Sequence, residues 1–356
     1  MSDPLWKAPC WAALLFLLAA WDRAPVRAAE PTVLEGHSGN IAALAFSPDG
    51  KWLASGATGS RDHGVRLWDA ATGSTKFEYQ LDERGAAFSL AFSPDGKRLV
   101  VGDLGLSLRV LEIPSGRELA AWPTSPDKGY TANRVAYSPD GKTVAAGLRD
   151  GTIKLYDAST GKVTSQLAHG HEITALAFSP DGHRLASGTS FGLRLWDPAA
   201  EKVIANLDQD SSGQFEVQSL AFTPAGKTLV VGDSPGSVRF LNAADGAALR
   251  SFRMPRVGEK TTVDAVVITP DGRTIYGTGM LPSAGNKATL FEGVVALEAA
   301  SALPIGVAQV NNTWGEHVQR LAITPDGKRL AVSIDGSHEI YLLKTDSIVP
   351  VNRLGK

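Results

Sequence analysis

Histidine side chains are the groups in this sequence that most directly suggest chemistry, because neutral imidazole nitrogens are common metal ligands. Of the 7 histidines, His169 and His171 are nearest to each other, and alternate residues of a strand lie on one face. A metal site nevertheless needs three or four converging ligands, with further groups that orient them. The other histidines are scattered along the sequence, so we expect no metal site.

Sequence patterns that hold cofactors are also missing. The chain contains no His-Glu-x-x-His zinc motif and no phosphate-binding glycine loop. Its 1 cysteine, Cys10, excludes a Cys-x-x-Cys-His haem motif and an internal disulfide. The aspartates of the recurring Pro-Asp-Gly segments are spread along the chain, whereas calcium requires roughly six to eight oxygens around one point. We therefore expect no cofactor and no catalytic residue.

The strongest pattern in the sequence is one short turn motif that occurs seven times. Successive copies are about 40 to 55 residues apart, which is a period typical of repeat architectures. Proline presets the backbone for the first central position of a turn, and glycine takes the left-handed position that follows. Each copy is therefore predicted to close a β-hairpin. The copies are Ser47–Lys51, Ser93–Lys97, Ser138–Lys142, Ser179–His183, Thr223–Lys227, Thr269–Arg273 and Thr324–Lys328.

Short strand patterns surround every turn. An apolar triplet such as Leu44–Phe46 precedes the turn, and a second strand such as Trp52–Ser55 follows it. A third strand is clearest in Val65–Asp69, and a turn containing Thr72-Gly73 leads to a fourth. Four antiparallel strands per period, with no helical pattern in the repeats, predict an all-β fold. We expect residues 31–356 to form a single seven-bladed β-propeller of four-stranded antiparallel blades.

The Gly36-His37 pair, the Ser-Pro-Asp-Gly turns and the Leu-Trp-Asp strand endings resemble those of WD-repeat β-propellers. This resemblance implies a hydrogen-bonded structural network of His, Ser, Asp and Trp in each complete blade. The first repeat carries all four types, the fourth carries three, and the third and seventh retain only the aspartate. The expected network residues are His37, Ser55, Asp62 and Trp68, then His169, Ser187 and Trp196, and finally Asp150 and Asp335.

The first 28 residues do not belong to the repeats. Lys7 precedes the mainly apolar run Cys10–Trp21, which is shorter than the roughly 20 residues that a membrane-spanning helix needs. Val26-Arg27-Ala28 then offers small side chains at the positions that a signal peptidase reads. We therefore predict a cleaved signal peptide over residues 1–28, no membrane span and a secreted or periplasmic location. A buried helix or an uncleaved anchor is the alternative.

Charge and chain ends give weaker indications. The 35 basic and 37 acidic residues give a net charge of −2, which does not favour nucleic acid or an anionic membrane as a partner. We expect a monomer. Either Thr32–Glu35 or Ile348–Leu354 could supply the outer strand that closes the ring, and the N-terminal segment is the preferred interpretation.

The loops suggest where a partner binds. The Pro-Asp-Gly and Thr-Gly turns share one rim and are nearly identical, whereas the connections on the opposite rim differ from one another. Binding residues concentrate on loops held by a rigid scaffold, and aromatic and arginine side chains often anchor interfaces. As the resemblance implies, we expect a non-enzymatic scaffold that binds a protein or peptide through this rim. The candidate residues are Tyr130, Phe191, Arg256 and Trp314, together with the insertion Met280–Phe291.

Two other classes of function remain open. Propellers of other families include lactonases and hydrolases with a site at the central channel, where Arg134, Gln218, Asp264 and Gln319 are the candidates at the starts of the inner strands. A carbohydrate-binding propeller is the third class, if Tyr130 and Trp314 line an exposed groove. A core position for Trp314 and a solvated loop face for Arg256 are the plainer interpretations of those two residues.

Overall fold

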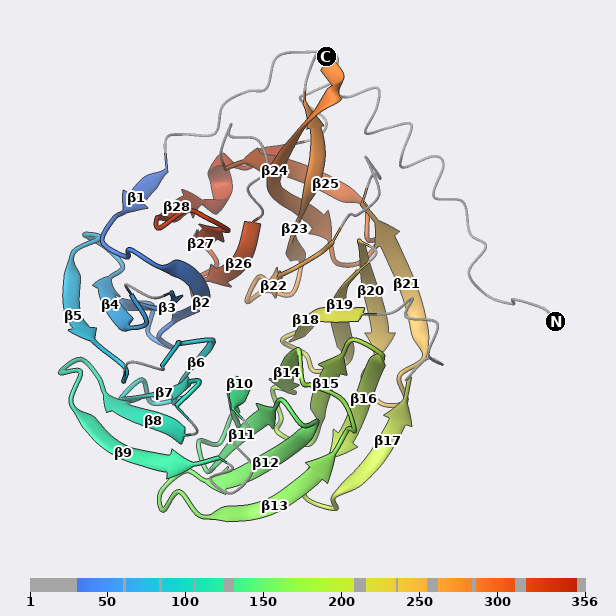
Figure 1. Cartoon of the computed structure of the whole chain (residues 1–356). Coiled ribbons are helices and arrows are strands. Elements are labelled where there is room, and N and C mark those ends of the chain that lie inside the picture. Colours follow the sequence, from blue (N-terminus) through green and yellow to red (C-terminus); the bar gives the residue numbers. More distant parts are fainter. Residues whose placement is uncertain are drawn as a thin grey trace.

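A computed structural model describes residues 31–59, 62–82, 85–105, 107–124, 131–207, 216–234, 236–254, 262–283, 286–310 and 318–350. These residues form seven antiparallel sheets, which Figure 1 shows as wedges around a common centre. The predicted all-β, seven-bladed β-propeller is therefore confirmed. None of the described segments forms a helix with the length and apolar character that crossing a membrane requires. The predicted signal peptide, residues 1–28, lies outside the described residues.

Each blade runs from an inner strand beside the axis to an outer strand at the circumference (Figure 1). Blade 1 contains β2 (Asn40–Phe46), β3 (Trp52–Thr58), β4 (Val65–Asp69) and β5 (Thr75–Tyr79). Blade 2 contains β6 (Ser89–Phe92), β7 (Arg98–Gly102), β8 (Ser107–Glu112) and β9 (Glu118–Pro123). Blade 3 contains β10 (Ala132–Tyr137), β11 (Thr143–Leu148), β12 (Thr152–Asp157) and β13 (Val163–Ala168). Blade 4 contains β14 (Ala175–Phe178), β15 (Leu185–Thr189), β16 (Gly192–Asp197) and β17 (Lys202–Asn206).

The remaining three blades follow the same order, with additions at the chain ends. Blade 5 contains β18 (Glu216–Phe222), β19 (Thr228–Ser234), β20 (Ser237–Asn242) and β21 (Ala248–Arg253). Blade 6 contains β22 (Val266–Ile268), β23 (Thr274–Ser283), β24 (Asn286–Glu298), β25 (Pro304–Gln309) and β29 (Val349–Pro350). Blade 7 contains β26 (Val318–Ile323), β27 (Arg329–Ile334) and β28 (Ile340–Lys344), followed by β1 (Thr32–Leu34) as its outer strand.

The two ends of the described chain pair with different blades. The N-terminal strand β1 pairs antiparallel with β28, with Val33 opposite Tyr341. Blade 7 therefore combines the first strand of the propeller with the three strands of the last repeat, and this pairing closes the ring. The C-terminal strand β29 pairs with β25 instead, which gives blade 6 a fifth strand. The N-terminal segment thus has the closing role that the sequence favoured, and the C-terminal segment extends the neighbouring blade.

The insertion in the sixth repeat is a continuation of two strands. β23 and β24 remain paired from Thr274 opposite Glu298 to Ser283 opposite Asn286. This long hairpin extends beyond the outline of the ring in Figure 1. The described parts of the insertion Met280–Phe291, residues 280–283 and 286–291, therefore belong to the β-sheet, because their backbone groups continue the antiparallel pairing.

The repeated turn is stabilised by its own side chains. In the first copy the Ser47 hydroxyl donates to Asp49 Oδ1 at 2.6 Å, and the Lys51 N–H donates to the same oxygen at 3.1 Å. Trp52 N–H donates to Ser47 Oγ at 3.0 Å, which joins the turn to the second strand. Gly50 adopts a φ of +71°, a left-handed conformation that glycine accepts without a steric cost. The contacts that hold this turn thus come from residues within it or next to it.

The fifth turn offers a test of this account, because Ala225 stands where the other repeats have aspartate. Thr223 Oγ1 there donates to the Thr228 carbonyl oxygen at 3.2 Å, and Ala225 has no carboxylate that could accept the Lys227 N–H. Ala225→Asp should raise the free energy of unfolding by about 0.5 to 1.5 kcal/mol. Asp271→Ala in the next turn, which also begins with threonine, should lower it by a similar amount. Urea denaturation of both variants measures these changes, and a destabilising Ala225→Asp would contradict the assignment.

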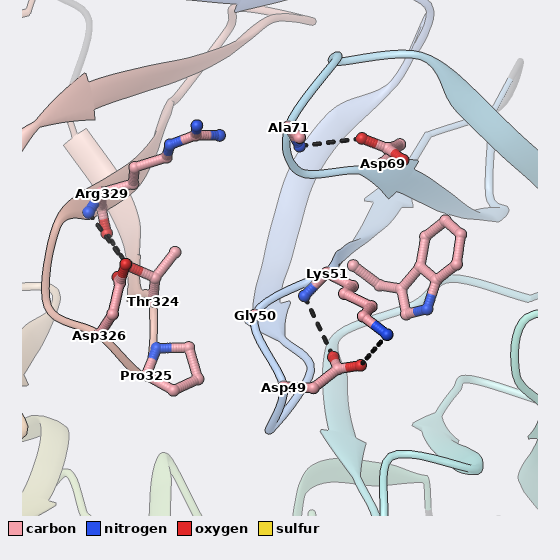
Figure 2. Close-up of a pocket in the computed structure, with 10 residues that line it drawn as sticks. Asp49, Gly50, Lys51, Asp69, Ala71, Thr324, Pro325, Asp326 and Arg329 are labelled. Atoms are coloured by element: carbon pink, nitrogen blue, oxygen red, sulfur yellow. Dashed lines mark hydrogen bonds and ion pairs between the residues drawn. The ribbon is translucent and has the colours of Figure 1, made fainter.

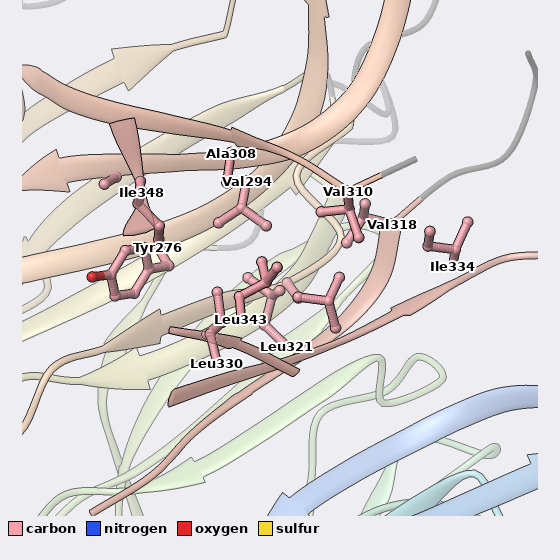
Figure 3. Packing of buried hydrophobic residues seen from close by; sticks show 13 residues of the cluster. Tyr276, Val294, Ala308, Val310, Val318, Leu321, Leu330, Ile334, Leu343 and Ile348 are labelled. Carbon is pink, nitrogen blue, oxygen red and sulfur yellow. The ribbon is translucent and has the colours of Figure 1, made fainter. Parts of the chain in front are cut away.

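The hydrophobic core lies between neighbouring blades. Figure 3 shows one such cluster, in which Tyr276 and Val294 of blade 6 pack with Leu321, Leu330 and Leu343 of blade 7. Comparable clusters join other pairs of adjacent blades. Because each blade buries apolar side chains on both faces, no blade has a complete core of its own, and the ring holds the strands in fixed positions.

Candidate functional site

The first repeat contains a buried chain of polar side chains that connects two strands, β3 and β4, with the loops before β2 and before β4. Trp68 Nε1 donates to Ser55 Oγ at 2.8 Å, and Ser55 Oγ lies 2.7 Å from His37 Nε2. His37 Nδ1 lies 2.8 Å from Asp62 Oδ2. Every group is satisfied when the serine hydroxyl donates to Nε2 and the Nδ1–H donates to the carboxylate. These hydrogen bonds attach the loop before β2 to the interior of blade 1, so the network has a structural role.

Asp62 makes this network sensitive to acid. Burial by itself raises the pKa of the Asp62 carboxyl, but the hydrogen bonds that it accepts from His37 and from the Ser38 N–H outweigh this effect. The net effect holds the pKa of Asp62 well below its usual range. A carboxyl whose pKa is lower in the folded protein contributes stability above the ordinary value, 3.8, and that contribution is lost as the pH falls below it.

Asp62→Asn should therefore lower the free energy of unfolding at about pH 7 more than at about pH 3. The asparagine cannot ionise, so only the wild-type protein loses this contribution in acid. Urea denaturation of both proteins across that range gives the difference directly. A constant difference between the two proteins would show that Asp62 is not the titrating group.

The other predicted network residues follow the first repeat only in part. In the fourth repeat His169 Nδ1 lies 2.8 Å from Ser187 Oγ, and Trp196 Nε1 donates to the same oxygen at 2.8 Å. Asp150 instead accepts the N–H of Thr152 at 2.9 Å, which is a local turn contact. Asp335 accepts a hydrogen bond from the side chain of Asn40, across the junction of blades 7 and 1. These two aspartates are therefore not brought to a His, Ser and Trp set within the described residues.

Of the predicted partner-binding residues, only Phe191 lies in the described part of the chain. Tyr130, Arg256 and Trp314 fall outside the described residues, and the carbohydrate-binding alternative depends on two of them. Phe191 lies in the connection between β15 and β16 and is half-buried. Its ring packs against the exposed His171 ring of the preceding connection, with the ring centroids 4.3 Å apart. The aromatic contact thus joins two loops of the same rim.

Hydrogen bonds and an ion pair extend this rim surface toward blade 3. Asn133 Nδ2 donates to Glu172 Oε1 at 2.5 Å, and Arg149 Nε lies 3.7 Å from Glu172 Oε2. Asn133 is the second residue of the inner strand β10, Arg149 follows β11, and Glu172 follows β13. We call these three residues with His171 and Phe191 the blade 3–4 rim patch. Its members come from four separate segments of the chain, so the sequence did not indicate that they would meet.

Two segments match the Gly-x-Ser-x-Gly pattern of hydrolase nucleophiles, Gly188–Gly192 and Gly232–Gly236. The pattern requires a sharp turn from a strand into a helix, which exposes the serine beside an oxyanion site. Gly188–Gly192 joins β15 to β16, and Gly232–Gly236 joins β19 to β20. Both segments therefore connect strands of one blade, and the match gives no support to a serine hydrolase.

The central channel contains a cavity of about 250 Å³ that all seven inner strands line. Three of the predicted channel residues line it, namely Arg134, Gln218 and Asp264. Arg320 lines it as well and was missed by the sequence reasoning. Alignment of the seven repeats on their turn prolines would have found it, because Arg134 and Arg320 occupy the same place in their repeats. Within the described residues, no three His, Cys, Asp or Glu side chains gather as a metal site would require.

The opposite rim has hollows between neighbouring turns. Figure 2 shows one of about 530 Å³ between blades 1 and 7, where Asp49, Gly50 and Lys51 face Pro325 and Arg329. A similar hollow of about 450 Å³ lies between the turns of blades 3 and 4. Both hollows lie between equivalent turns of neighbouring blades, so they arise from the repeated architecture. Both hollows are lined in part by aspartates of the repeated turns, Asp49 and Asp326 in one and Asp140 and Asp181 in the other.

Comparison with known families agrees with this geometry. The family described as WD domain, G-beta repeat matches residues 29–69 and 161–197. The family described as anaphase-promoting complex subunit 4 WD40 domain matches residues 120–172 and 194–267. These matches fall on the repeats that form the described blades. The chain is a WD-repeat β-propeller.

Several curated proteins resemble parts of this WD-repeat chain. Small ribosomal subunit protein RACK1y of Oryza sativa subsp. japonica is 33% identical over 115 residues, which are 31% of this chain and 34% of that protein. Cross-pathway control WD-repeat protein 2 of Flammulina velutipes is 29% identical over 254 residues, covering 58% of this chain and 80% of that protein. Periodic tryptophan protein 2 homolog of Dictyostelium discoideum is 27% identical over 210 residues, covering 58% and 22%. The WD-repeat chain thus spans about a third of the RACK1 relative.

The relatives contradict the predicted secreted or periplasmic location. RACK1y is named as a protein of the small ribosomal subunit, which lies inside the cell, and another RACK1 relative, from Brassica napus, carries the same description. The prediction was wrong because it depended on a short apolar run after a basic residue. The length of an apolar run decides whether a helix can span a membrane, but it does not specify the compartment in which the protein resides.

Proposed function

We propose that this WD-repeat protein is a non-enzymatic scaffold that binds a protein or peptide through its loop-rich rim. The observation that supports the proposal is the difference between the two rims. Seven nearly identical hairpin turns occupy one rim, whereas the connections on the other differ in length and in side chains. A rim of repeated turns offers every partner the same contacts. We therefore assign selective binding to the rim whose connections differ. The names of the WD-repeat relatives, which include ribosomal proteins, agree with a role in assemblies.

Contacts between blades support rigid display of this rim. The Asn133–Glu172 hydrogen bond joins blade 3 to the connection before blade 4. At the ring closure, Gly336 N–H donates to Asn40 Oδ1 at 2.9 Å, and His338 Nδ1 lies 3.1 Å from the Gly39 carbonyl oxygen. Loops held in this way lose little conformational entropy when a partner binds. Affinity then depends on the side chains that the loops present.

Phe191 is the anchor whose surroundings are described, and Tyr130, Arg256 and Trp314 complete the proposed set. Aromatic and arginine side chains dominate binding energy at many interfaces because they bury large areas and donate several hydrogen bonds. Phe191 already rests on His171, so its ring is held in place without a partner. The exposed members of the blade 3–4 rim patch would surround it with polar contacts.

A fourfold alanine variant tests this proposal. Replacement of Tyr130, Phe191, Arg256 and Trp314 should weaken binding of a partner captured with the wild-type chain by about tenfold or more. The matched control replaces four exposed apolar residues of the outer strands, namely Leu119, Val163, Val203 and Leu249. Biolayer interferometry measures binding, and circular dichroism confirms that both variants fold. Equal affinity of the two variants, with both folded, would reject the rim as the binding surface.

A further inference from the structure

A ring of seven equivalent residues lines the central channel. Each stands five positions before the proline of its turn, near the start of an inner strand. Five members are small and two are arginines, which belong to blades 3 and 7. The ring consists of Ala43, Ser89, Arg134, Ala175, Ser219, Ala265 and Arg320, and all seven line the cavity. The two long cations therefore project from an otherwise small-residue ring.

The two arginines are held in the same manner. Arg134 Nε donates to the carbonyl oxygen of Thr174 in the next repeat. Its Nη1 donates to the backbone carbonyl oxygen of the adjacent residue, Asn133, at 2.7 Å. Arg320 Nε donates to the carbonyl oxygen of Ala42 at 2.7 Å, and its Nη1 donates to the backbone carbonyl oxygen of Gln319 at 2.8 Å. Within the described residues, neither Nη2 group has a hydrogen-bond partner. Each guanidinium is thus anchored on one side and has unused donors on the other.

Two serines of the ring add further donors. Ser89 Oγ accepts the N–H of Val135 at 3.0 Å, and Ser219 Oγ accepts the N–H of Val266 at 3.0 Å. A serine hydroxyl can accept and donate at the same time. Because these contacts use the oxygen as an acceptor, the hydroxyl hydrogen of each serine remains available to a ligand in the channel.

The charge balance of the cavity is positive. Arg134 and Arg320 face one lining carboxylate in the described residues, Asp264, which accepts the hydroxyl of Thr262 at 3.0 Å. Burial lowers the pKa of Arg134, and the charge of Arg320 lowers it further, while Glu172 opposes the change. Burial also lowers the pKa of Arg320, opposed by Asp264 and Asp335. Arginine side chains stay charged in proteins at neutral pH, and burial makes both of these charges less favourable than they would be in water.

We propose that the central channel binds a compact oxyanion, such as a phosphate or carboxylate group, between Arg134 and Arg320. Two desolvated cations of like charge gain most from an anion that both can contact, and guanidinium donors match the planar and tetrahedral oxygens of these groups. The hydroxyls of Ser89 and Ser219 supply additional hydrogen bonds. A cavity of about 250 Å³ is smaller than the roughly 300 to 1,000 Å³ of drug-sized pockets, which favours a small group. The proposal does not depend on partner binding at the rim.

Titration of the full chain with inorganic phosphate by isothermal calorimetry tests the site. Wild-type protein should bind phosphate, and Arg134→Gln with Arg320→Gln should weaken binding by about tenfold or more. Arg98→Gln is the matched control, because Arg98 Nη1 also donates to a carbonyl of the next blade, Ala158 O, at 3.0 Å but lies outside the cavity. The control should bind phosphate as the wild type does. Unchanged affinity in the double variant would overturn the proposal.

Asp264→Asn keeps the test decisive if the double variant does not fold. Removal of the Asp264 carboxylate should tighten phosphate binding by about fivefold, because its negative charge no longer opposes the anion. No binding up to about 10 mM phosphate by wild type and by Asp264→Asn would overturn the proposal. N-acetyl phosphoserine amide and N-acetyl glutamate amide identify the source of the anion. Tighter binding of either than of phosphate or acetate assigns the site to an acidic group on a peptide, and weaker binding assigns it to a free anion.

Discussion

Trp68→Ala should lower the free energy of unfolding by about 3 to 5 kcal/mol. The Trp68 side chain is only 1% exposed, and it packs with Leu53 and Ile41 in the cluster between blades 7 and 1. Its ring also meets the His37 ring edge-on, with the centroids 6.1 Å apart. Alanine leaves a cavity at this junction and removes the indole donor from Ser55. Urea denaturation, analysed by linear extrapolation, measures the loss.

Two further variants separate the causes of this loss. Trp68→Phe keeps an aromatic ring but no donor, so it should cost less than alanine and more than a surface change. Leu249→Ala, at a side chain that is 50% exposed, should change stability by about 0.5 kcal/mol or less. Similar losses for Trp68→Ala and Leu249→Ala would contradict the position of Trp68 in the core.

Leu34→Ala should lower the free energy of unfolding by about 2 to 5 kcal/mol and loosen the ring closure. Leu34 is 3% exposed and packs with Ile340 and Leu342, while its strand pairs with β28. The lost packing therefore weakens blade 7, where β1 joins the strands of the last repeat. Hydrogen exchange should show faster exchange of the β28 amides in the variant, because the outer strand that covers them opens more often.

The neighbouring residue provides the control. Val33 lies on the same strand and points to the other face, where it is 38% exposed. Val33→Ala should leave both the stability and the exchange of β28 nearly unchanged. If Leu34→Ala destabilised the protein while exchange in β28 stayed at the wild-type rate, β1 would fill a cavity without closing the ring.

The sequence alone determined the features that depend on neighbouring residues. The turn from Ser47 to Lys51 is held by contacts among its own residues, and its seven copies set the number of blades. The alternating strands around each turn follow from the same short stretches. The expected set of His37, Ser55, Asp62 and Trp68 came from the resemblance to WD repeats, and its hydrogen bonds appear in the structure.

Only the tertiary structure decided which distant residues meet. Backbone pairing at the edge of a blade has little dependence on side-chain type, so the sequence favoured β1 over the C-terminal segment as the closing strand but did not place β29 in blade 6. The channel site has the same origin, because Arg134 and Arg320 are far apart in the chain and approach only when the ring closes. Local chemistry thus specified each blade, and closure of the ring placed the charges of separate blades around one axis.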